Sequence, residues 1–162
     1  MNQKIVQICG LCGSGKSTIA KKLKKEFNAS VYNIGEYRDL YKDEDTTWYK
    51  FVGDILNDCN KLIVIETTGI NGREKLLYNI PDVKILLNAS CKVLDKRINM
   101  KPIFKRGWKI FRPSKVFNTY RDKKDFNRKV WEVLETLKKT CIVIDAEKPI
   151  DLVYNEIRSK IN

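Results

Sequence analysis

The sequence predicts an α/β fold in which a five-stranded parallel sheet is covered by helices on both faces. Two observations predict it. Short apolar segments typical of strands alternate along the chain with amphipathic segments typical of helices. Residues 61–66, "KLIVIE", form an apolar run, as expected of a strand that is covered on both faces. The 162 residues fit one compact domain, 1–162, and no internal repeat or low-complexity linker divides it.

The elements of the first half follow in order. Residues 4–9, "KIVQIC", are β-branched and apolar and predict a strand before a Gly-rich turn. The next segment predicts an amphipathic helix with lysines on its outer face and these residues on its inner face: Ile19, Ala20, Leu23 and Phe27. "SVYNI", 30–34, predicts the second strand. A further helix has Thr46 or Thr47 as its predicted N-cap. We expect its apolar face to consist of Trp48, Phe51, Val52, Ile55, Leu56 and Cys59.

The second half continues the alternation. After the third strand, 61–66, we expect a helix that Pro81 closes, then a fourth strand over 83–88 and a helix beginning at Cys91. A helix from about 123 to 139 follows, with these residues facing inward: Phe126, Val130, Val133, Leu134 and Leu137. "TCIVIDA", 140–146, predicts a fifth strand. The last helix begins near Pro149, which suits the first turn of a helix.

Residues 9–18, "CGLCGSGKST", fit two interpretations. Cys9 and Cys12 have the Cys-x-x-Cys spacing of a dithiol centre, and a thiol near a helix N-terminus and a lysine would be acidified. Residues 10–17 spell G-x-x-x-x-G-K-S, the phosphate loop, with a strand before it and a helix after it. The dithiol interpretation leaves three glycines and Lys16 unexplained, so we favour the phosphate loop.

Each part of the predicted phosphate loop has a physical role. The glycines let successive backbone N–H groups point inward at phosphate oxygens, and the helix N-terminus adds a partial positive charge. Lys16 adds a full charge, and the Ser17 hydroxyl is a ligand for Mg²⁺. The predicted cofactor-binding residues here are Gly10, Cys12, Gly13, Ser14, Gly15, Lys16, Ser17 and Thr18.

Two further segments place carboxylates and arginines at the carboxyl edge of the sheet, where ligands of parallel α/β folds bind. "YNIGEYRDLY" brings Glu36, Arg38 and Asp39 to this edge; the alternative is that these charges only cap a helix. "IETTGIN" ends the third strand with Glu66, which is placed to hold Mg²⁺; the alternative is an ordinary acidic strand end.

The chain has no histidine, so a general base for an acceptor hydroxyl is expected to be a carboxylate. The candidates are Glu36, Asp39 and Glu66. We predict Glu36 as the base or acceptor-orienting group and Glu66 as the metal-side carboxylate, with the two roles exchangeable. Arg38 and Arg73 are expected to clamp an anionic acceptor, because a guanidinium binds phosphate through two parallel bonds.

Positive charge is concentrated late in the chain. The net charge is +12, and residues 101–130 hold eleven Lys or Arg against two Asp. Such a run is often only a solvated face, but its place between the fourth and fifth strands suits a basic lid over about 98–123. The residues expected to meet phosphate are Arg97, Lys105, Arg106 and Arg112. A basic lid does not by itself require a nucleic acid.

The composition excludes other classes of protein. Five cysteines and no histidine suggest neither a disulfide framework nor a structural zinc site. Purely aliphatic runs reach four residues, far below the length of a membrane span, and "MNQK" leads into the Gly-rich loop without a signal-peptide core. We expect a cytoplasmic protein without a membrane anchor, and the sequence indicates no protein partner.

With these motifs the chain resembles the P-loop kinases of the nucleoside and nucleotide kinase-like group. The similarity rests on "GLCGSGKST", "IETTG", "LDKRI" and "IDAEKPID". "YNIGEYR" is similar to a stretch of polynucleotide 5′-hydroxyl kinases and of 6-phosphofructo-2-kinases, and "LDKRI" to the pre-lid helix of adenylylsulfate kinases. The chain has Gly35-Glu36 and Glu66 where many members have aspartates.

The resemblance implies a P-loop NTPase fold with strand order 2-3-1-4-5, ATP and Mg²⁺ as cofactors, γ-phosphoryl transfer and an adenine contact near Ala146. The leading hypothesis is therefore a kinase whose acceptor is a nucleotide or nucleic-acid hydroxyl, with Lys16, Glu36, Arg38, Glu66, Arg97 and Arg106 as catalytic residues. A kinase of a small phosphorylated metabolite and an NTP-binding switch remain alternatives. The GTPase base-specificity string N-K-x-D does not occur in the sequence.

Overall fold

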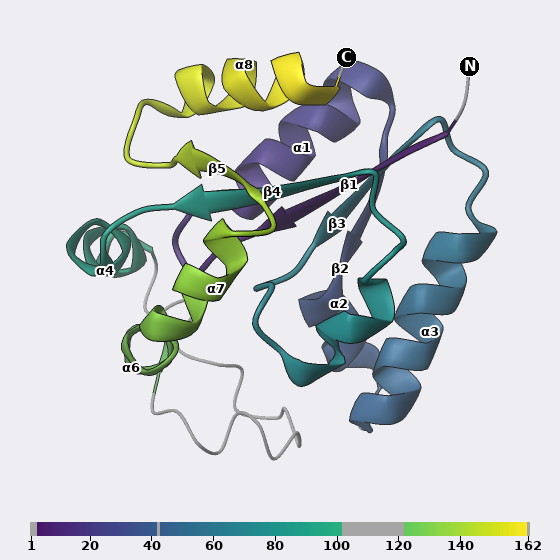
Figure 1. Cartoon of the computed structure of the whole chain (residues 1–162), viewed down its shortest axis with the longest axis horizontal. Helices are drawn as coiled ribbons and strands as arrows, with labels where there is room; N and C mark the ends of the chain where they lie inside the picture. Colours follow the sequence, from purple (N-terminus) through teal and green to yellow (C-terminus); the bar gives the residue numbers. More distant parts are fainter. Residues whose placement is uncertain (1–2, 42, 102–121, 162) are drawn as a thin grey trace.

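A five-stranded parallel sheet forms the centre of the molecule (Figure 1). The computed structural model describes residues 3–41, 43–101 and 122–161. The strands are β1 (Lys4–Cys9), β2 (Ser30–Asn33), β3 (Leu62–Glu66), β4 (Val83–Asn88) and β5 (Ile142–Asp145). They lie in the order β2-β3-β1-β4-β5, and each neighbouring pair is parallel. The predicted fold class and strand order are confirmed.

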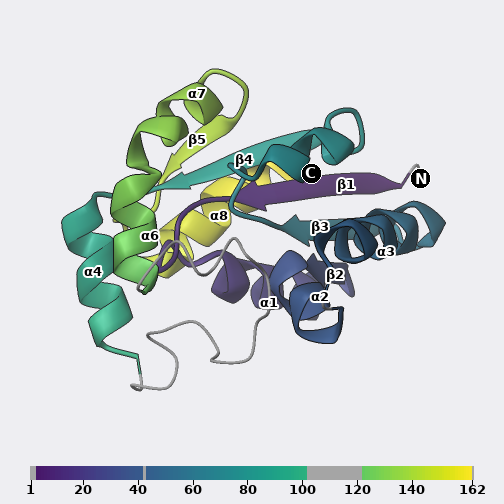
Figure 2. The ribbon, with the colours of Figure 1, turned by 90° about the horizontal axis from the view of Figure 1, so that it is seen from below.

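Helices cover both faces of the sheet (Figures 1 and 2). α1 (Lys16–Phe27) and α8 (Ile150–Ile161) lie on one face, and α3 (Glu44–Asn57) lies on the other. The remaining α-helices are α2 (Ile34–Leu40), α4 (Cys91–Asn99), α6 (Lys123–Lys129) and α7 (Leu134–Lys138), and the 3₁₀ helices are η1 (Gly72–Leu77) and η3 (Trp131–Val133). No helix in the described part of the chain combines the length and apolarity that crossing a membrane requires.

Strand β3 shows how the core holds the site in place. Its Val64 packs into the larger core cluster, together with Ile19 and Leu23 of α1, whereas Ile63 and Ile65 pack against residues of α3. Successive side chains of a strand point to opposite faces, so both faces of β3 are buried, as the apolar run predicted. Because the strands are parallel, the segments that follow β1, β2 and β3 all emerge at one edge of the sheet.

The beginning and end of α3 differ from the prediction. Asp43 is the N-cap, and its Oδ2 accepts a bond of 2.7 Å from the backbone N–H of Thr46. Thr47 is instead buried one turn further on, where its hydroxyl donates to the Asp43 carbonyl oxygen at 2.7 Å. Leu56 is 63% exposed because it lies beside the buried stripe of the helix, and Cys59 lies beyond the end of the helix and is exposed.

Two other predicted helices take a different form. The helix expected before Pro81 is the 3₁₀ helix η1, which Asn71 caps and which ends at Leu77. The helix expected over 123–139 is broken into α6, η3 and α7. A 3₁₀ turn has about 3.0 residues per turn instead of about 3.6, so Val133, the last residue of η3, turns away from the core, whereas Leu134 and Leu137 of α7 face it as predicted. Val133 is consequently 44% exposed, not inward as predicted.

The predicted lid over 98–123 falls largely outside the described residues. Its flanks are described, from the last turn of α4 to Lys101 and again from Asp122, the N-cap of α6. Lys105, Arg106 and Arg112 lie outside the described residues. Their expected contact with phosphate stays a prediction.

Candidate active site

The loop between β1 and α1 has the backbone geometry of a phosphate-binding turn. Gly10, Gly13 and Gly15 have φ values of 148°, 90° and 99°, a region that residues with a Cβ rarely adopt. A Cβ at Gly10 would also lie 2.7 Å from Ser14 Oγ and 2.8 Å from the carbonyl oxygen of Leu87. Both constraints exclude a larger residue at Gly10, so the loop requires the glycine that the motif places there.

Lys16 extends its side chain back across this loop. Its Nζ donates to the carbonyl oxygens of Gly10 at 2.6 Å and of Leu11 at 3.0 Å. Burial lowers the pKa of the Lys16 ammonium, and the neighbouring Cys12 and Glu66 act in the opposite direction. The ammonium is thus held at the inner side of the turn, at the N-terminus of α1, where an anion is also favoured by the helix dipole.

A hydroxyl and a carboxylate meet beside Lys16. Ser17 Oγ donates to Glu66 Oε2 at 2.7 Å, and Asn33 Nδ2 donates to the same oxygen at 3.2 Å. Burial raises the pKa of Glu66, against the lowering effects of the Ser17 hydrogen bond and the Lys16 charge. The two residues that sequence reasoning assigned to the metal, Ser17 and Glu66, are therefore in direct contact.

This donor set fits Mg²⁺ in a nucleotide site. Mg²⁺ usually keeps several waters and is bound by one or two protein oxygens together with substrate phosphates. Ser17 and Glu66 supply one hydroxyl and one carboxylate at the N-terminus of α1. Within the described ranges no group of three or more His, Cys, Asp or Glu residues could enclose a metal, so a site here would depend on phosphate oxygens for its remaining ligands.

A pocket of about 330 Å³ lies on the β3 side of the phosphate loop; we call it the β3-side pocket. It combines basic residues with an apolar wall. The basic residues are Lys16, Arg38, Lys101 and Lys123, and the apolar ones include Ile34, Ile70, Phe126 and Val130. Cys12, Ser17, Asn33 and Glu66 also line it. Such a lining suits a small molecule that has both an anionic group and an apolar part.

A second pocket, of about 370 Å³, lies against α4 and α8; we call it the α8-side pocket. Most of its lining belongs to the phosphate loop and the first turn of α1. The lining residues are Gly13, Gly15, Lys16, Ser17, Thr18, Arg97, Lys101 and Ile150. Gly13, Lys16, Ser17 and Lys101 line both pockets, so the two pockets meet at the phosphate loop.

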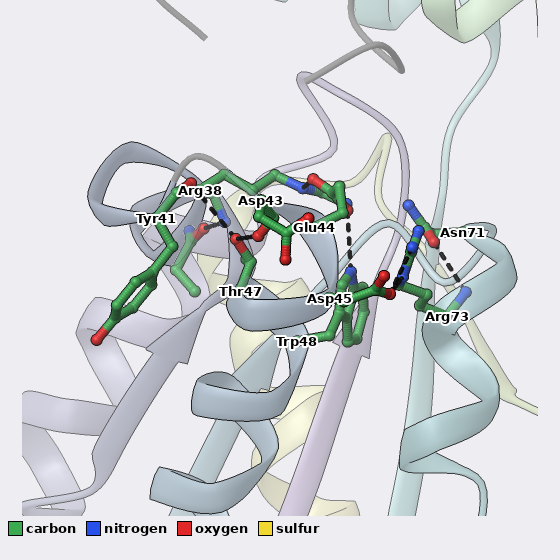
Figure 3. A network of polar contacts seen from close by, with 11 residues as sticks. Arg38, Tyr41, Asp43, Glu44, Asp45, Thr47, Trp48, Asn71 and Arg73 are labelled. Carbon is green, nitrogen blue, oxygen red and sulfur yellow. Dashed lines mark hydrogen bonds and ion pairs between the residues drawn. The ribbon is translucent and has the colours of Figure 1, made fainter. Parts of the chain in front are cut away.

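The two arginines predicted to clamp an acceptor lie in different surroundings (Figure 3). Arg38 lines the β3-side pocket, and its Nε and Nη2 bond both carboxylate oxygens of Glu44 at 2.7 and 3.1 Å. The Arg38 and Glu44 side chains are only 10% and 12% exposed. Arg73 pairs with Asp45 at 2.6 Å on the surface and does not line this pocket. Only Arg38 is in place to contact a ligand of the β3-side pocket.

Trp48 completes the support of Arg38. Its indole N–H donates to Glu44 Oε2 at 3.2 Å, and the Arg38 guanidinium lies 5.9 Å from the centre of the Trp48 ring (Figure 3). Trp48 itself is fully buried in the hydrophobic core that α3 forms with the sheet. The guanidinium is therefore held in one orientation on the pocket wall by residues of the neighbouring helix.

The loop after β3 is anchored from behind by a buried polar network. Gln7 Nε2 donates to Thr67 Oγ1 at 3.0 Å and to Glu74 Oε2 at 2.9 Å. The other carboxylate oxygen of Glu74 accepts from the Gly69 N–H at 3.1 Å. Burial raises the pKa of Glu74 to about 7, despite hydrogen bonds from Thr67, Gly69 and Gln7 that favour the carboxylate. This network fixes Thr67 and Gly69, which flank Thr68 on the wall of the β3-side pocket.

Several predicted site residues lie outside both pockets. Glu36 and Asp39 are exposed on α2 and line neither, although the Glu36 charge acts on Glu66 and raises its pKa. Ala146 is buried, and its N–H donates to the Asn88 carbonyl oxygen at 2.8 Å. Ile150, four residues later, lines the α8-side pocket instead. The roles predicted for Glu36 and Ala146 stay predictions.

Sequence reasoning missed other residues of the site. Asn33 was treated only as part of a strand, although it precedes the carboxyl edge and the same argument that selected Glu36 would have selected it. Phe126 and Val130 were predicted as core and do pack there, but they also line the β3-side pocket. Lys101 and Lys123 belong to the basic run, whose pattern does not distinguish pocket residues from solvated ones.

The cysteines do not form the dithiol centre of the alternative interpretation. All five are free thiols. The buried Cys9 thiol contacts Thr67 Oγ1 at 3.8 Å, and a hydrogen bond with Cys141, followed by burial, raises the pKa of Cys9. A reactive dithiol needs a thiol with a lowered pKa that is open to attack. Cys9 has neither property, so the structure favours the phosphate loop.

Comparison with known proteins gives the same picture of the fold. No protein-family model and no curated protein matches the sequence. Among solved structures, the chain is similar to shikimate kinase from Bacteroides thetaiotaomicron, with a TM-score of 0.65, 12% identity and coverage of 96% of this chain and 97% of that one. For shikimate kinase from Aquifex aeolicus the TM-score is 0.61 and the identity 17%, and the match covers 96% of this chain and 94% of that one. For deoxyadenosine kinase from M. mycoides with bound dATP the TM-score is 0.56 and the identity 17%, and the match covers 99% of this chain and 100% of that one.

The chain has the P-loop NTPase fold, which it shares with these kinases. The similarity extends over 96–99% of this chain and 94–100% of the compared chains. At these levels of identity the comparison establishes the fold alone. The comparison does not confirm the subgroup suggested by the sequence motifs, which included polynucleotide kinases and adenylylsulfate kinases, and it does not determine the acceptor.

Proposed function

We propose that this protein is an ATP- and Mg²⁺-dependent kinase that transfers the γ-phosphoryl group to a hydroxyl of a nucleotide or of a nucleic-acid end. One observation carries the proposal. The phosphate loop lies between two pockets that share Lys16 and Ser17, so a triphosphate reaching from the α8-side pocket presents its last phosphate to the β3-side pocket. This is the arrangement that a reaction between two bound substrates requires.

The α8-side pocket is suited to the nucleotide. Backbone N–H groups of the loop and the α1 N-terminus would bind the phosphates, and the Lys16 ammonium would exchange the carbonyl oxygens of Gly10 and Leu11 for phosphate oxygens. Arg97, in the last turn of α4, adds a positive charge, and Ile150 at the start of α8 offers an apolar surface for a base. Ala146 is buried and does not line this pocket, so the adenine contact predicted for it stays a prediction.

Ser17 and Glu66 would hold the Mg²⁺, which supplies charge neutralisation on the phosphates when bound. Glu66 is also the carboxylate that faces the acceptor. It lines the β3-side pocket as a candidate base, and the hydrogen bond from Asn33 fixes its orientation. Glu36, which is exposed on α2, is the alternative base. The sequence assigned Glu36 as the base and Glu66 as the metal-side carboxylate, with the two roles exchangeable. The position of Glu66 on the wall of the β3-side pocket supports its contact with the acceptor.

The β3-side pocket is suited to a small anionic acceptor. Its volume of about 330 Å³ lies near the lower end of the range for ligand pockets, so it holds one small molecule or the terminal unit of a polymer. Arg38, Lys101 and Lys123 favour an anionic group, and Phe126 offers an apolar face against which a base can pack. The same features favour a second candidate, a kinase of a small phosphorylated metabolite, because cations and a small volume suit it equally.

An acceptor screen tests the proposal. The protein is incubated with ATP labelled in the γ-phosphate and Mg²⁺, together with nucleoside monophosphates, oligonucleotides with 5′-hydroxyl ends, or sugar phosphates. We expect label on a nucleotide or an oligonucleotide, and label on oligonucleotides should decrease with added salt. Label on sugar phosphates alone would favour the second candidate. Hydrolysis of ATP without a labelled acceptor would contradict both and favour an NTP-dependent switch.

A further inference from the structure

Asn127 makes an unusual connection between two parts of the site that are 115 residues apart in sequence. Its side chain is 1% exposed, in the middle of α6. Asn127 Oδ1 accepts from the Cys12 N–H at 3.0 Å, and Asn127 Nδ2 donates to the Cys12 carbonyl oxygen at 2.9 Å. One amide side chain therefore binds both polar backbone groups of a single residue in the phosphate loop.

The bound residue, Cys12, lies in the part of the loop that is expected to contact phosphate. Cys12 is between Leu11, whose carbonyl oxygen accepts from Lys16 Nζ, and Gly13, which lines both pockets. A Cβ at Gly13 would lie 3.1 Å from the Leu94 carbonyl oxygen of α4, so the backbone here has little room. A displacement of the Cys12 peptide by a bound triphosphate would pass directly to the Asn127 side chain.

The same helix forms the far wall of the β3-side pocket. Phe126 and Val130, one helical turn apart, line this pocket together with Lys123, and Asn127 lies between them in the sequence of α6. Two other described contacts of α6 lie near the surface. Arg128 pairs with Asp95 at 2.6 Å and is 57% exposed, and Lys124 Nζ donates to Asn99 Oδ1 at 3.2 Å. Exposed pairs of this kind hold a helix weakly, whereas a buried pair of hydrogen bonds holds it in register.

We propose that Asn127 is a positioning residue that couples occupation of the phosphate loop to the placement of the acceptor wall formed by α6. The inference rests on the proposed function, because it needs a triphosphate in the loop. With a nucleotide bound, the phosphate loop and the Cys12 peptide are fixed in position. The two hydrogen bonds of Asn127 then fix α6, and with it Phe126, Val130 and Lys123 on the pocket wall. Nucleotide binding then orders the acceptor pocket, and by linkage an acceptor raises the affinity for nucleotide by the same factor.

Amide hydrogen exchange tests the coupling without knowledge of the acceptor. Exchange over residues 123–129 is measured with and without Mg²⁺ and a non-hydrolysable ATP analogue in the wild-type chain, in Asn127→Ala and in Arg128→Ala. We expect the analogue to slow exchange in α6 roughly tenfold in the wild type and in Arg128→Ala. In Asn127→Ala the analogue should protect the phosphate loop but leave α6 unchanged.

The outcomes separate the two proposals. If the wild type does not bind the analogue, the proposed function and this inference both fail. If all three proteins bind it and α6 is protected equally, the coupling through Asn127 is refuted while the proposed function stands. Asn127→Asp is the second variant in case Asn127→Ala does not fold, because it keeps the volume and the bond from the Cys12 N–H, while its carboxylate cannot donate to the Cys12 carbonyl oxygen and repels it. Full protection of α6 in a folded Asn127→Asp protein would also count against the proposal.

Discussion

The two pockets that meet at Lys16 are built in different ways. The α8-side pocket draws most of its lining from one continuous stretch of the chain, 13–18. The β3-side pocket is assembled from the phosphate loop, the β2–α2 junction, the loop after β3 and helix α6. Its residues are held in place by other side chains: Glu44 pairs with Arg38, and Asn127 hydrogen-bonds Cys12 of the phosphate loop. Under the proposed function, phosphate binding would therefore be a local property of the backbone, whereas recognition of the acceptor would be a property of the tertiary structure.

This difference predicts which substitutions act on which step. Changes at the shared loop should reduce transfer to every acceptor, because both pockets depend on the transferred phosphate. Changes on the acceptor side should alter the KM for the acceptor and leave the binding of nucleotide nearly unchanged. The three predictions below test this division, beginning with the largest effect.

Lys16→Ala should abolish phosphoryl transfer. The substitution removes the ammonium that lies inside the loop and that would stabilise charge on the transferring group, so we expect kcat to fall by on the order of 10³-fold. The effect should be equal for every acceptor that the wild type uses. The measurement is steady-state transfer of labelled phosphate from ATP.

The fold should survive this substitution. Among the described residues Lys16 hydrogen-bonds only loop carbonyl oxygens, and the substitution removes a buried ammonium whose pKa is lowered by burial. We expect a circular dichroism spectrum and a melting temperature close to those of the wild type. Unchanged turnover, or a loss confined to one acceptor, would contradict the idea that the loop serves both pockets.

The same division explains how much of the structure could be predicted. The phosphate loop, the strand before it and the helix after it follow from residues that are neighbours in the sequence, and the prediction of β1 over 4–9 and of β4 over 83–88 is confirmed to the residue. Ser17 and Glu66, which the sequence assigned to one Mg²⁺, are in contact because parallel strands bring their ends to one edge, while their role at a metal stays a prediction. Local pattern and topology were sufficient for these features.

The rest depends on contacts that no local pattern encodes. Arg38 and Arg73 follow neighbouring strands and looked equivalent, but Glu44 and Asp45 of α3 direct them to different places. Asn127 has no signal at all in the sequence, since an asparagine on a basic helix resembles a solvated residue. Helical periodicity likewise does not report that α6 ends before Val130, which packs into the core.

Arg38→Ala and Arg73→Ala test the acceptor side, with a smaller effect than Lys16→Ala. We expect Arg38→Ala to raise the KM for the acceptor about tenfold to hundredfold with little change in the KM for ATP. It should also destabilise the fold by about 3 kcal/mol, because Glu44 would remain buried without its partner. Acceptor kinetics and urea denaturation measure the two effects.

Arg73→Ala is the matched control, because its ion pair with Asp45 is on the surface, where the side chains are 36% and 81% exposed. Exposed pairs contribute less than about 1 kcal/mol, and Arg73 lies outside the β3-side pocket. We expect nearly unchanged kinetics and stability. Equal effects of the two substitutions on the acceptor KM would show that the acceptor does not bind where the structure places Arg38.

The smallest expected effect is the pH dependence of stability that comes from Glu74. Glu74 belongs to the buried polar network that supports the loop after β3. Burial raises the pKa of Glu74 to about 7 in the folded chain, from 4.5 for an unperturbed group. Between these two values the folded chain keeps a proton that the unfolded chain has released. Stability therefore falls as the pH rises from about 4.5 to about 7, by at most roughly 3 kcal/mol, and changes little further above pH 7 through this group.

Glu74→Gln removes the titration and should flatten this part of the pH dependence. Gln accepts from the Gly69 N–H as Glu74 does, and reorientation of the Gln7 amide lets the pair keep a hydrogen bond. The variant should gain stability over the wild type between pH 5 and pH 8, as measured by urea denaturation across that range. The exposed Glu132→Gln should follow the wild type. If the free energies of unfolding of Glu74→Gln and the wild type change in parallel with pH, Glu74 does not titrate as a buried group in this range. The loop after β3 would then depend less on buried side-chain contacts than the structure indicates, as the phosphate loop does.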